Sequence, residues 1–154
     1  MKMNAQDIKT FPKFTKYVST SLPGLANVKP IISAIESISE FGDTAAIKAA
    51  LSWGHGPMVE VKILIDKQVG RQVVSPRAGY TPHTNTITMR QRDVLDYEND
   101  KDLRKTHNGH TVHIVGVQLL HELTHWAREQ AGKGEDEDLG FVFEKEIYGG
   151  IVTD

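Results

Sequence analysis

Residues 121–126 read HELTHW, and this string limits what the chain can fold into more than any other part of the sequence. His121 and His125 are four positions apart, so on a helix their side chains lie on one face, about one turn apart. Two imidazoles placed in this way can bind one Zn²⁺, and the carboxylate of Glu122 then lies beside the metal, where it can take a proton from water. The string therefore predicts a metal site on a helix.

The residues around the motif favour a long amphipathic helix. From Thr111, a predicted N-cap, to Ala131, apolar residues recur at helical spacing, and Gly132 ends the pattern. The apolar stripe lies away from His121 and His125, so we expect the helix to bury one face and to present both histidines on another. The alternative is a core helix with incidental histidines. It is disfavoured because two imidazoles and a carboxylate rarely gather on an apolar helix without a partner.

A catalytic zinc site also needs a third protein ligand, because three protein ligands leave one position for water. Downstream lies the stretch GEDEDLGFVFEKEIYGG, in which Glu144 follows His125 with eighteen residues between them. We expect residues 139–148 to form a helix that carries Glu144. The string EDED is typical of a solvated acidic loop. The other carboxylates that remain open as ligands are Glu146, then Asp138 and Asp136.

The sequence from HELTHW onward resembles the zincin-type metallopeptidase domains at the ends of bacterial polymorphic toxins and secretion-system effectors. Those domains have a Trp after HELTH, a short loop rich in glycine and acids, and then the stretch D/E-x-G-x-x-F-E-x-x-x-Y-G. The matching residues here are Asp138, Gly140, Phe143, Glu144, Tyr148 and Gly149. The resemblance covers about a third of the chain. It implies a zinc peptidase of gluzincin type with Glu144 as the third ligand. Deuterolysin-like aspzincins use an aspartate in a G-T-x-D frame, which this chain lacks.

Length and composition suit one small enzyme. The chain has 154 residues, of which 39% are hydrophobic, and this is enough for a core. A net charge of −2 gives no sign of nucleic-acid binding, and no apolar run is long enough to span a bilayer. The N-terminal segment lacks the hydrophobic region of a secretory signal. These features fit a fragment of a larger effector, an effector secreted without a cleaved signal, or an ordinary cytoplasmic peptidase. The resemblance to effectors favours secretion, or delivery by a secretion system, without a cleaved signal peptide. The absence of cysteine excludes disulfides and thiolate ligands.

We predict an α+β, zincin-like fold, in which a small twisted sheet, antiparallel or mixed, packs on the active-site helix with further helices. Residues 1–30, with three prolines, are predicted to be an arm or linker, and residues 31–154 to be the metallopeptidase domain. Further helices are expected at residues 31–42 and, capped by Asp43, at residues 44–53.

Three segments of the chain have the pattern of strands, namely residues 58–65, 71–75 and 84–89. We expect the second to pair with the first through a turn near Gly70. We take residues 84–89 as the edge strand beside the cleft, because an extended peptide can add to a free strand edge.

Other polar side chains have candidate roles near the site. Those that compete to donate a hydrogen bond to the oxyanion formed during hydrolysis are Tyr80, His83 and Tyr148. Tyr148 is preferred because it lies one turn beyond Glu144. A rival metal site with a weaker case is the cluster of His107, His110 and His113, which lie in a polar loop without a nearby acid.

The combined prediction is a zinc-dependent metallohydrolase that cleaves peptide bonds, with His121, His125 and Glu144 as ligands. Glu122 is the general base that then protonates the leaving amine, and Tyr148 assists. The substrate is a protein or peptide, and the toxin resemblance implies an immunity protein or a secretion carrier as a further partner. Two alternatives remain. One is a peptidoglycan amide hydrolase, and the other is a non-catalytic binding module stabilised by zinc.

Overall fold

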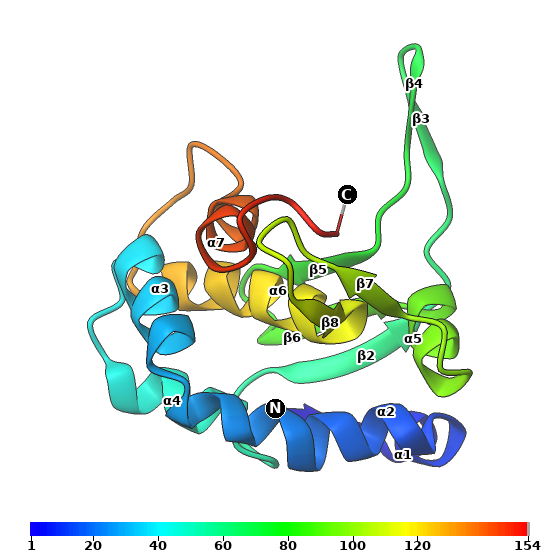
Figure 1. Ribbon diagram of the computed structural model, residues 1–154, viewed down its shortest axis with the longest axis horizontal. Coiled ribbons are helices and arrows are strands. Elements are labelled where there is room, and N and C mark those ends of the chain that lie inside the picture. The colour runs from blue at the N-terminus through cyan, green and yellow to red at the C-terminus, as the bar shows by residue number, and fades with distance from the viewer. Residues whose placement is uncertain (154) are drawn as a thin grey trace.

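The computed structural model describes residues 1–153 and has an α+β fold with a small mixed sheet, as predicted. The long helix α6 (Ile114–Gln130) carries the HELTHW motif and runs through the middle of the molecule (Figure 1). Its side chains Leu119, Leu120 and Leu123 are buried in the core. Within residues 1–153, no helix is long and apolar enough to cross a membrane.

The main sheet has four strands in the order β1-β2-β6-β5. Their bounds are β1 (Lys2–Met3), β2 (Met58–Lys62), β5 (Ala78–Thr81) and β6 (Thr86–Arg90). β1, β2 and β6 are parallel, and β5 pairs with β6 in the antiparallel sense. The prediction that residues 84–89 form the edge is therefore wrong. β6 has a neighbour on both sides, its Ile87 and Met89 are completely buried, and the edge nearest the motif is β5.

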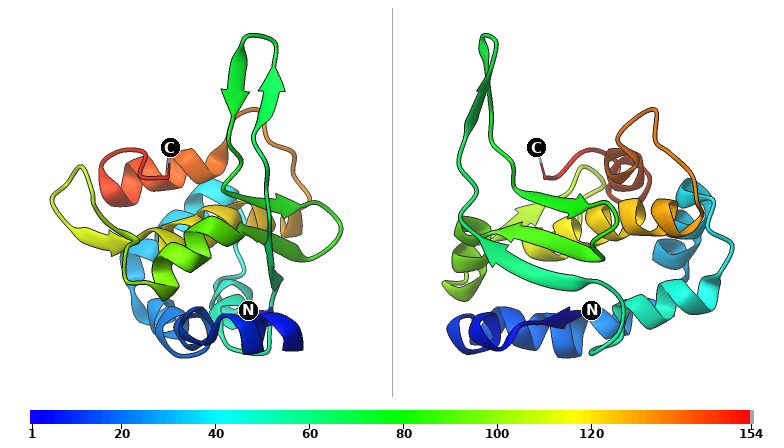
Figure 2. Two further views of the ribbon diagram at one scale, coloured as in Figure 1. Left: turned by 90° about the vertical axis from the view of Figure 1, so that its right-hand side faces the viewer. Right: turned by 180° about the vertical axis from the view of Figure 1, so that it is seen from behind.

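Two hairpins stand apart from this sheet. One pairs β3 (Lys67–Val69) with β4 (Gln72–Val74), and the other pairs β7 (Leu103–Lys105) with β8 (Thr111–His113). The predicted pairing of residues 71–75 with the first strand is wrong, because β4 pairs with β3. Gly70 has a φ of 62°, which suits a two-residue turn that closes a hairpin locally. The β3–β4 hairpin projects far from the body of the molecule (Figure 2).

The N-terminal segment differs from the expected arm, because it forms helices that pack into the core. These are α1 (Ala5–Thr10), α2 (Pro12–Lys16), the π-helical turn η1 (Tyr17–Ser21) and the 3₁₀ helix η2 (Leu22–Asn27). Phe14, Val18 and Leu22 are completely buried. Pro12 and Pro23 stand in the first turn of their helices, where a missing N–H costs little.

The remaining helices are α3 (Lys29–Ser39), α4 (Thr44–Leu51), α5 (Gln91–Glu98) and α7 (Leu139–Tyr148). Asp43 caps α4 by accepting a hydrogen bond from the Ala46 amide at 2.9 Å, as predicted. α7 has the predicted bounds and packs against α6. The predicted N-cap Thr111 lies instead in β8, and His113 precedes the first residue of α6.

Candidate metal centre

The two motif histidines and one carboxylate converge where α6 meets the start of α7. The Nε2 atoms of His121 and His125 lie 3.2 and 3.3 Å from Oδ1 of Asp138. One ligand atom from each of the three residues lies within 4.8 Å of the other two. Two imidazole nitrogens and one carboxylate oxygen in this arrangement can hold one metal ion and leave a position for water.

The position of Asp138 follows from its place at the end of a helix. It is the N-cap of α7, and its Oδ1 accepts a hydrogen bond from the Phe141 amide at 3.1 Å. This bond holds the carboxylate at the point where α7 approaches the motif. An aspartate directly before a predicted helix is an N-cap signal. That signal separates Asp138 from the other acids of the EDED string.

Each histidine is oriented by a second carboxylate on its other nitrogen. Nδ1 of His121 lies 2.7 Å from Oε1 of Glu144, and Nδ1 of His125 lies 2.7 Å from Oε2 of Glu135. A carboxylate beside Nδ1 keeps the proton on that nitrogen and leaves Nε2 free to bind a metal. Sequence reasoning did not identify Glu135, because nothing in the sequence separates it from its acidic neighbours.

Glu122 lies beside the two imidazoles and is almost completely buried. Its Oε1 is 3.9 Å from Nε2 of His121, and its Oε2 accepts a hydrogen bond from the Tyr80 amide at 2.7 Å. Burial raises the pKa of Glu122, although the neighbouring imidazoles act in the opposite direction. A carboxylate with a raised pKa is suited to taking up a proton and returning it near neutral pH.

The edge strand β5 borders this site. Because the Tyr80 amide points to Glu122, it faces away from β6. Backbone groups alternate along a strand, so those of Ala78 face the same way as those of Tyr80. Since β5 pairs with β6 on one side only, its other side is a free edge above the motif.

A cavity of about 1040 Å³ contains the site. Its floor is formed by the motif residues of α6, and its walls are formed by β5, the base of the β3–β4 hairpin and the start of α7. The lining includes Val73, Val74, Arg77, Tyr80, Asp138 and Phe141. A polypeptide can therefore reach Glu122 from solvent along the free edge of β5.

Comparison with models of known protein families identifies the family of the chain. The family model of metallopeptidase toxin 3 matches residues 7–149, which include the whole metal centre. The chain belongs to the metallopeptidase toxin 3 family. Membership indicates a metal-dependent peptidase toxin, in agreement with the resemblance inferred from the motif. No curated protein and no solved structure matches the chain.

In this member of the metallopeptidase toxin 3 family, Glu144 lies on the Nδ1 side of His121. It is completely buried, and it accepts hydrogen bonds from the amides of Val152 at 2.6 Å and Thr153 at 3.0 Å. Burial alone would raise the pKa of Glu144, but hydrogen bonds from His121 and Thr153 lower it. The assignment of Glu144 as a ligand stays a prediction, and Asp138 is the carboxylate that groups with both Nε2 atoms. Glu146 is exposed.

The predicted oxyanion donors lie in different places. Tyr148 is not among the residues that line the cavity; it is buried and packs edge-on against Phe143, with the ring centroids 6.2 Å apart. Burial raises the pKa of its hydroxyl. Tyr80 and His83 do line the cavity, and Glu129 accepts hydrogen bonds from the Tyr80 hydroxyl and from the His83 amide. The catalytic role of Tyr148 stays a prediction.

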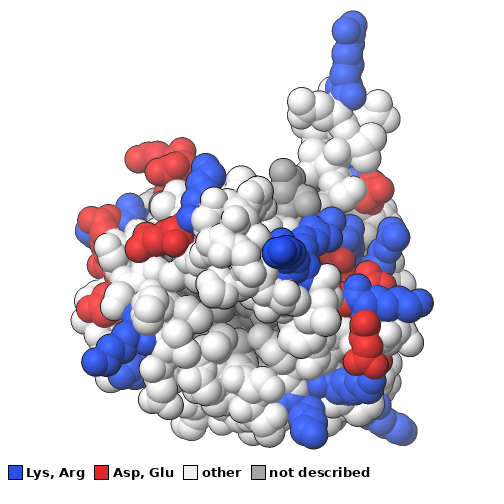
Figure 3. Space-filling model, viewed as in Figure 1, with Lys and Arg blue, Asp and Glu red and all other residues white. Residues whose placement is uncertain are grey.

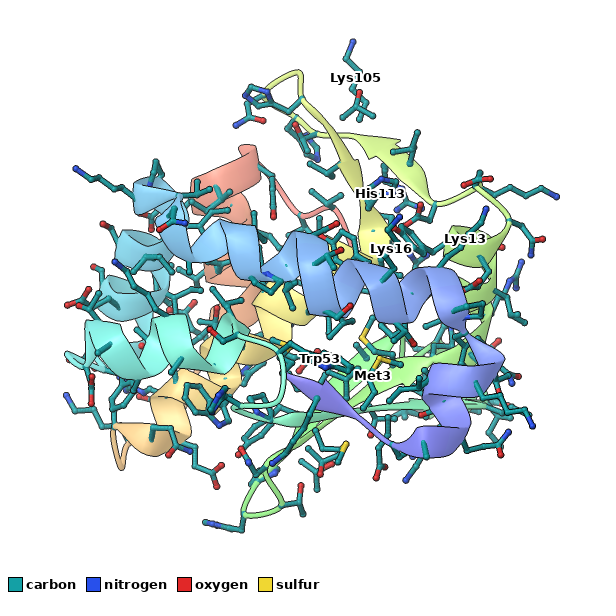
Figure 4. The ribbon with its side chains drawn as sticks, turned by 90° about the horizontal axis from the view of Figure 1, so that it is seen from below. Met3, Lys13, Lys16, Trp53, Lys105 and His113 are labelled. Carbon is teal, nitrogen blue, oxygen red and sulfur yellow. The ribbon has the colours of Figure 1, made fainter. Side chains whose placement is uncertain are left out.

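The three histidines before α6 do not form a second centre. His113 lies beside the N-terminal helices (Figure 4), where its ring packs against Tyr17 and its Nδ1 lies 2.8 Å from Oδ1 of Asp102. His107 instead contacts the carbonyl of Ile151. Within the described residues, the only group of metal-binding side chains is that of α6 and Asp138.

Proposed function

We propose that this toxin is a zinc-dependent peptidase that hydrolyses peptide bonds of a protein substrate. One observation carries the proposal. The Nε2 atoms of His121 and His125 converge on Asp138, with the Glu122 carboxylate beside them, in a cavity bordered by a free strand edge. A metal centre, a buried base and a strand edge are the three parts that metal-assisted hydrolysis of an extended peptide requires.

The donor set fits zinc. We propose that His121, His125 and Asp138 hold the ion, so that Asp138 takes the place first assigned to Glu144. Two imidazoles and one carboxylate are typical ligands of a catalytic zinc, and this chain has no cysteine for a thiolate site. When bound, zinc polarises the scissile carbonyl and lowers the pKa of water towards about 7.

The residues of the chain perform the proton transfers. Glu122 accepts the proton of the attacking water and then delivers it to the leaving amine. The Tyr80 amide holds the second oxygen of this carboxylate, so that the first oxygen faces the imidazoles. The outward backbone groups of Ala78 and the outward carbonyl of Tyr80 orient the substrate as an added strand, since the Tyr80 amide is already bonded to Glu122.

Membership of a toxin family favours delivery of the protein to other cells. We propose that its partners include the protein substrate, a secretion carrier and an immunity protein in the cell that makes the toxin. These partners follow from the family and not from any contact in the structure.

The test is hydrolysis by the purified, zinc-loaded chain, with casein and purified cell wall as separate substrates. We expect one zinc per chain and cleavage of casein. Glu122→Gln keeps an oxygen acceptor for the Tyr80 amide, so this variant is expected to bind zinc while its kcat falls by roughly 10²- to 10⁴-fold. Glu137→Gln, in the exposed acidic loop, is the matched control.

Three results would contradict the proposal. Cleavage of cell wall but not casein would identify a peptidoglycan amide hydrolase. Zinc binding without hydrolysis of either substrate would identify a binding module. Loss of zinc from Glu122→Gln would show that Glu122 is a ligand and not the base.

A further inference from the structure

The β3–β4 hairpin and its flanks, residues 63–76, form an arm. Each of the three views shows the arm standing clear of the body of the molecule (Figures 1 and 2). Its apolar side chains are largely exposed: Ile63 (75%), Ile65 (70%), Val69 (64%), Val73 (67%) and Val74 (47%). The register of the hairpin places Val69 and Val74 on one of its faces and Val73 on the other. An isolated two-stranded hairpin is only marginally stable in water, and exposed apolar residues gathered on one segment are typical of an interaction site. The arm therefore lacks a partner that would cover it.

The arm is continuous with the wall of the active-site cavity. Val73 and Val74 of β4 line this cavity, and so do residues 75–80, which lead directly into the edge strand β5. Residues 75–77 join β4 to β5, and the chain bends between them, so that the arm rises from the end of β5 at the rim of the cavity (Figure 1). A polypeptide that enters the site along β5 meets the arm at one end of its path.

The direction of the chain identifies which end of the substrate meets the arm. Antiparallel pairing is the more stable arrangement of two strands. The arm precedes β5 in the sequence, so an antiparallel substrate has its C-terminal part toward the arm. From Pro76 to Gly70 the arm extends over about six residues, or roughly 20 Å at 3.3 Å per residue. A substrate segment that turns from β5 onto the arm can lie along this length.

The charge of the arm indicates the composition of the substrate segment that it can bind. Lys67 and Arg71 are exposed on it, against a single acid, Asp66. A basic side chain stands at the tip of the arm, and much of the shaft below it is uncharged (Figure 3). An apolar segment with an acidic residue complements both features.

We propose that the arm is an exosite that binds an extended, apolar and acidic segment of an unfolded protein substrate on the C-terminal side of the scissile bond. The exosite rests on the proposed peptidase function. With such an exosite, the composition of the substrate segment that lies outside the cavity contributes to specificity. The exosite also favours unfolded polypeptides, because a folded domain does not present such a segment.

The test uses three peptides built on one cleavage site mapped in casein. The first is short, the second extends it at the C-terminus with an apolar, acidic segment, and the third carries the same segment at the N-terminus. The arm variant is Ile65→Ser with Val69→Ser, since both side chains are exposed and neither lines the cavity. Leu103→Ser, a similar change of an exposed residue (59%) that does not line the cavity, is the control.

For the unaltered protein, we expect the C-terminal extension to raise kcat/KM roughly tenfold, mainly through KM. The arm variant should lose this gain and cleave the short peptide as before, whereas Leu103→Ser should keep the gain. The peptide with the N-terminal extension should be cleaved with the same kcat/KM by all three proteins. No gain from the C-terminal extension, or a gain that the arm variant retains, would overturn the proposal.

A binding measurement separates the arm from catalysis. The labelled C-terminal segment alone should bind the unaltered protein, and the arm variant should bind it roughly tenfold more weakly by fluorescence anisotropy. Binding without cleavage of any peptide would contradict the peptidase function and leave the exosite standing. Absence of binding would overturn the exosite. A dimer that the arm variant converts to a monomer, seen by sedimentation, would show that a second copy covers the arm and would also overturn it.

Discussion

The ring of His121 lies directly against the backbone of Gly140. A Cβ at residue 140 would stand 2.1 Å from Cδ2 and 2.3 Å from Nε2 of that ring, so α7 approaches α6 this closely only because residue 140 has no side chain. This approach places Asp138 and Glu144, both contributed by the α7 segment, on opposite nitrogens of one imidazole.

Gly140→Ala is therefore expected to displace the ring of His121. Zinc affinity should fall at least tenfold, and the free energy of unfolding should decrease by about 1–3 kcal/mol, as in an overpacked core. A titration against a chelator and a thermal melt measure the two effects. Gly134→Ala is the control, because a Cβ there meets open space. Unchanged affinity in Gly140→Ala would mean that this contact does not position the ring.

Substitutions of Asp138 and of Glu144 are expected to have different effects on metal binding. Asp138→Ala removes a proposed ligand, so zinc affinity should fall more than 100-fold and the absorption spectrum of the Co²⁺-substituted protein should change. Glu144→Gln should lower zinc affinity about 10- to 100-fold without changing that spectrum, because it affects the orientation of the His121 ring and not the set of ligands. Asp136→Ala should resemble the unaltered protein. A spectral change in Glu144→Gln alone would restore Glu144 as the ligand.

Zinc binding should release protons at neutral pH. Burial lowers the pKa of His121, but hydrogen bonds with Asp138 and Glu144 and the charge of Glu122 outweigh it and raise this pKa to about 10. The pKa of His125 is raised as well. The His121 imidazole is then protonated at pH 7 in the metal-free protein and must lose a proton to bind metal. Zinc affinity should rise with pH up to about 10, by about tenfold per pH unit for each proton displaced.

Calorimetry in two buffers of different ionisation enthalpy counts the released protons, and we expect at least one per zinc at pH 7.5. The folding stability of the metal-free protein depends on pH in the opposite direction to its zinc affinity. The raised pKa of His121 stabilises the fold fully below about pH 6.5, and this contribution is lost as the pH rises through about 10. Zinc uptake without proton release would contradict the protonation proposed here.

Tyr148→Phe should leave kcat within about twofold of the unaltered value, because the side chain lies outside the cavity lining and a direct oxyanion donor would contribute about 10²- to 10³-fold. Steady-state kinetics on casein measure this. A fall in kcat of a hundredfold, with the fold intact by circular dichroism, would establish the catalytic role first assigned to this residue.

Several features that depend on local sequence were predicted, although the N-cap at Thr111 was not among them, and the features that depend on particular tertiary contacts were missed. α7 and the cap at Asp43 follow from helical periodicity and from side chains that bond their own backbone. The choice between Asp138 and Glu144 could not be made from spacing, because it depends on how α7 approaches α6 across Gly140. β5 was missed since its sequence, AGYT, has little strand signal without its partner β6.

The bond between the Tyr80 amide and Glu122 joins segments 42 positions apart in the chain. Asp138 and Glu135 likewise reach the histidines only after α7 has docked on α6. An unfolded chain thus contains the HELTHW motif but none of the partners that make it a site. The proposed peptidase activity therefore depends on the tertiary structure and not on the motif alone. Since the chain has no cysteine, assembly of the site needs no oxidation step.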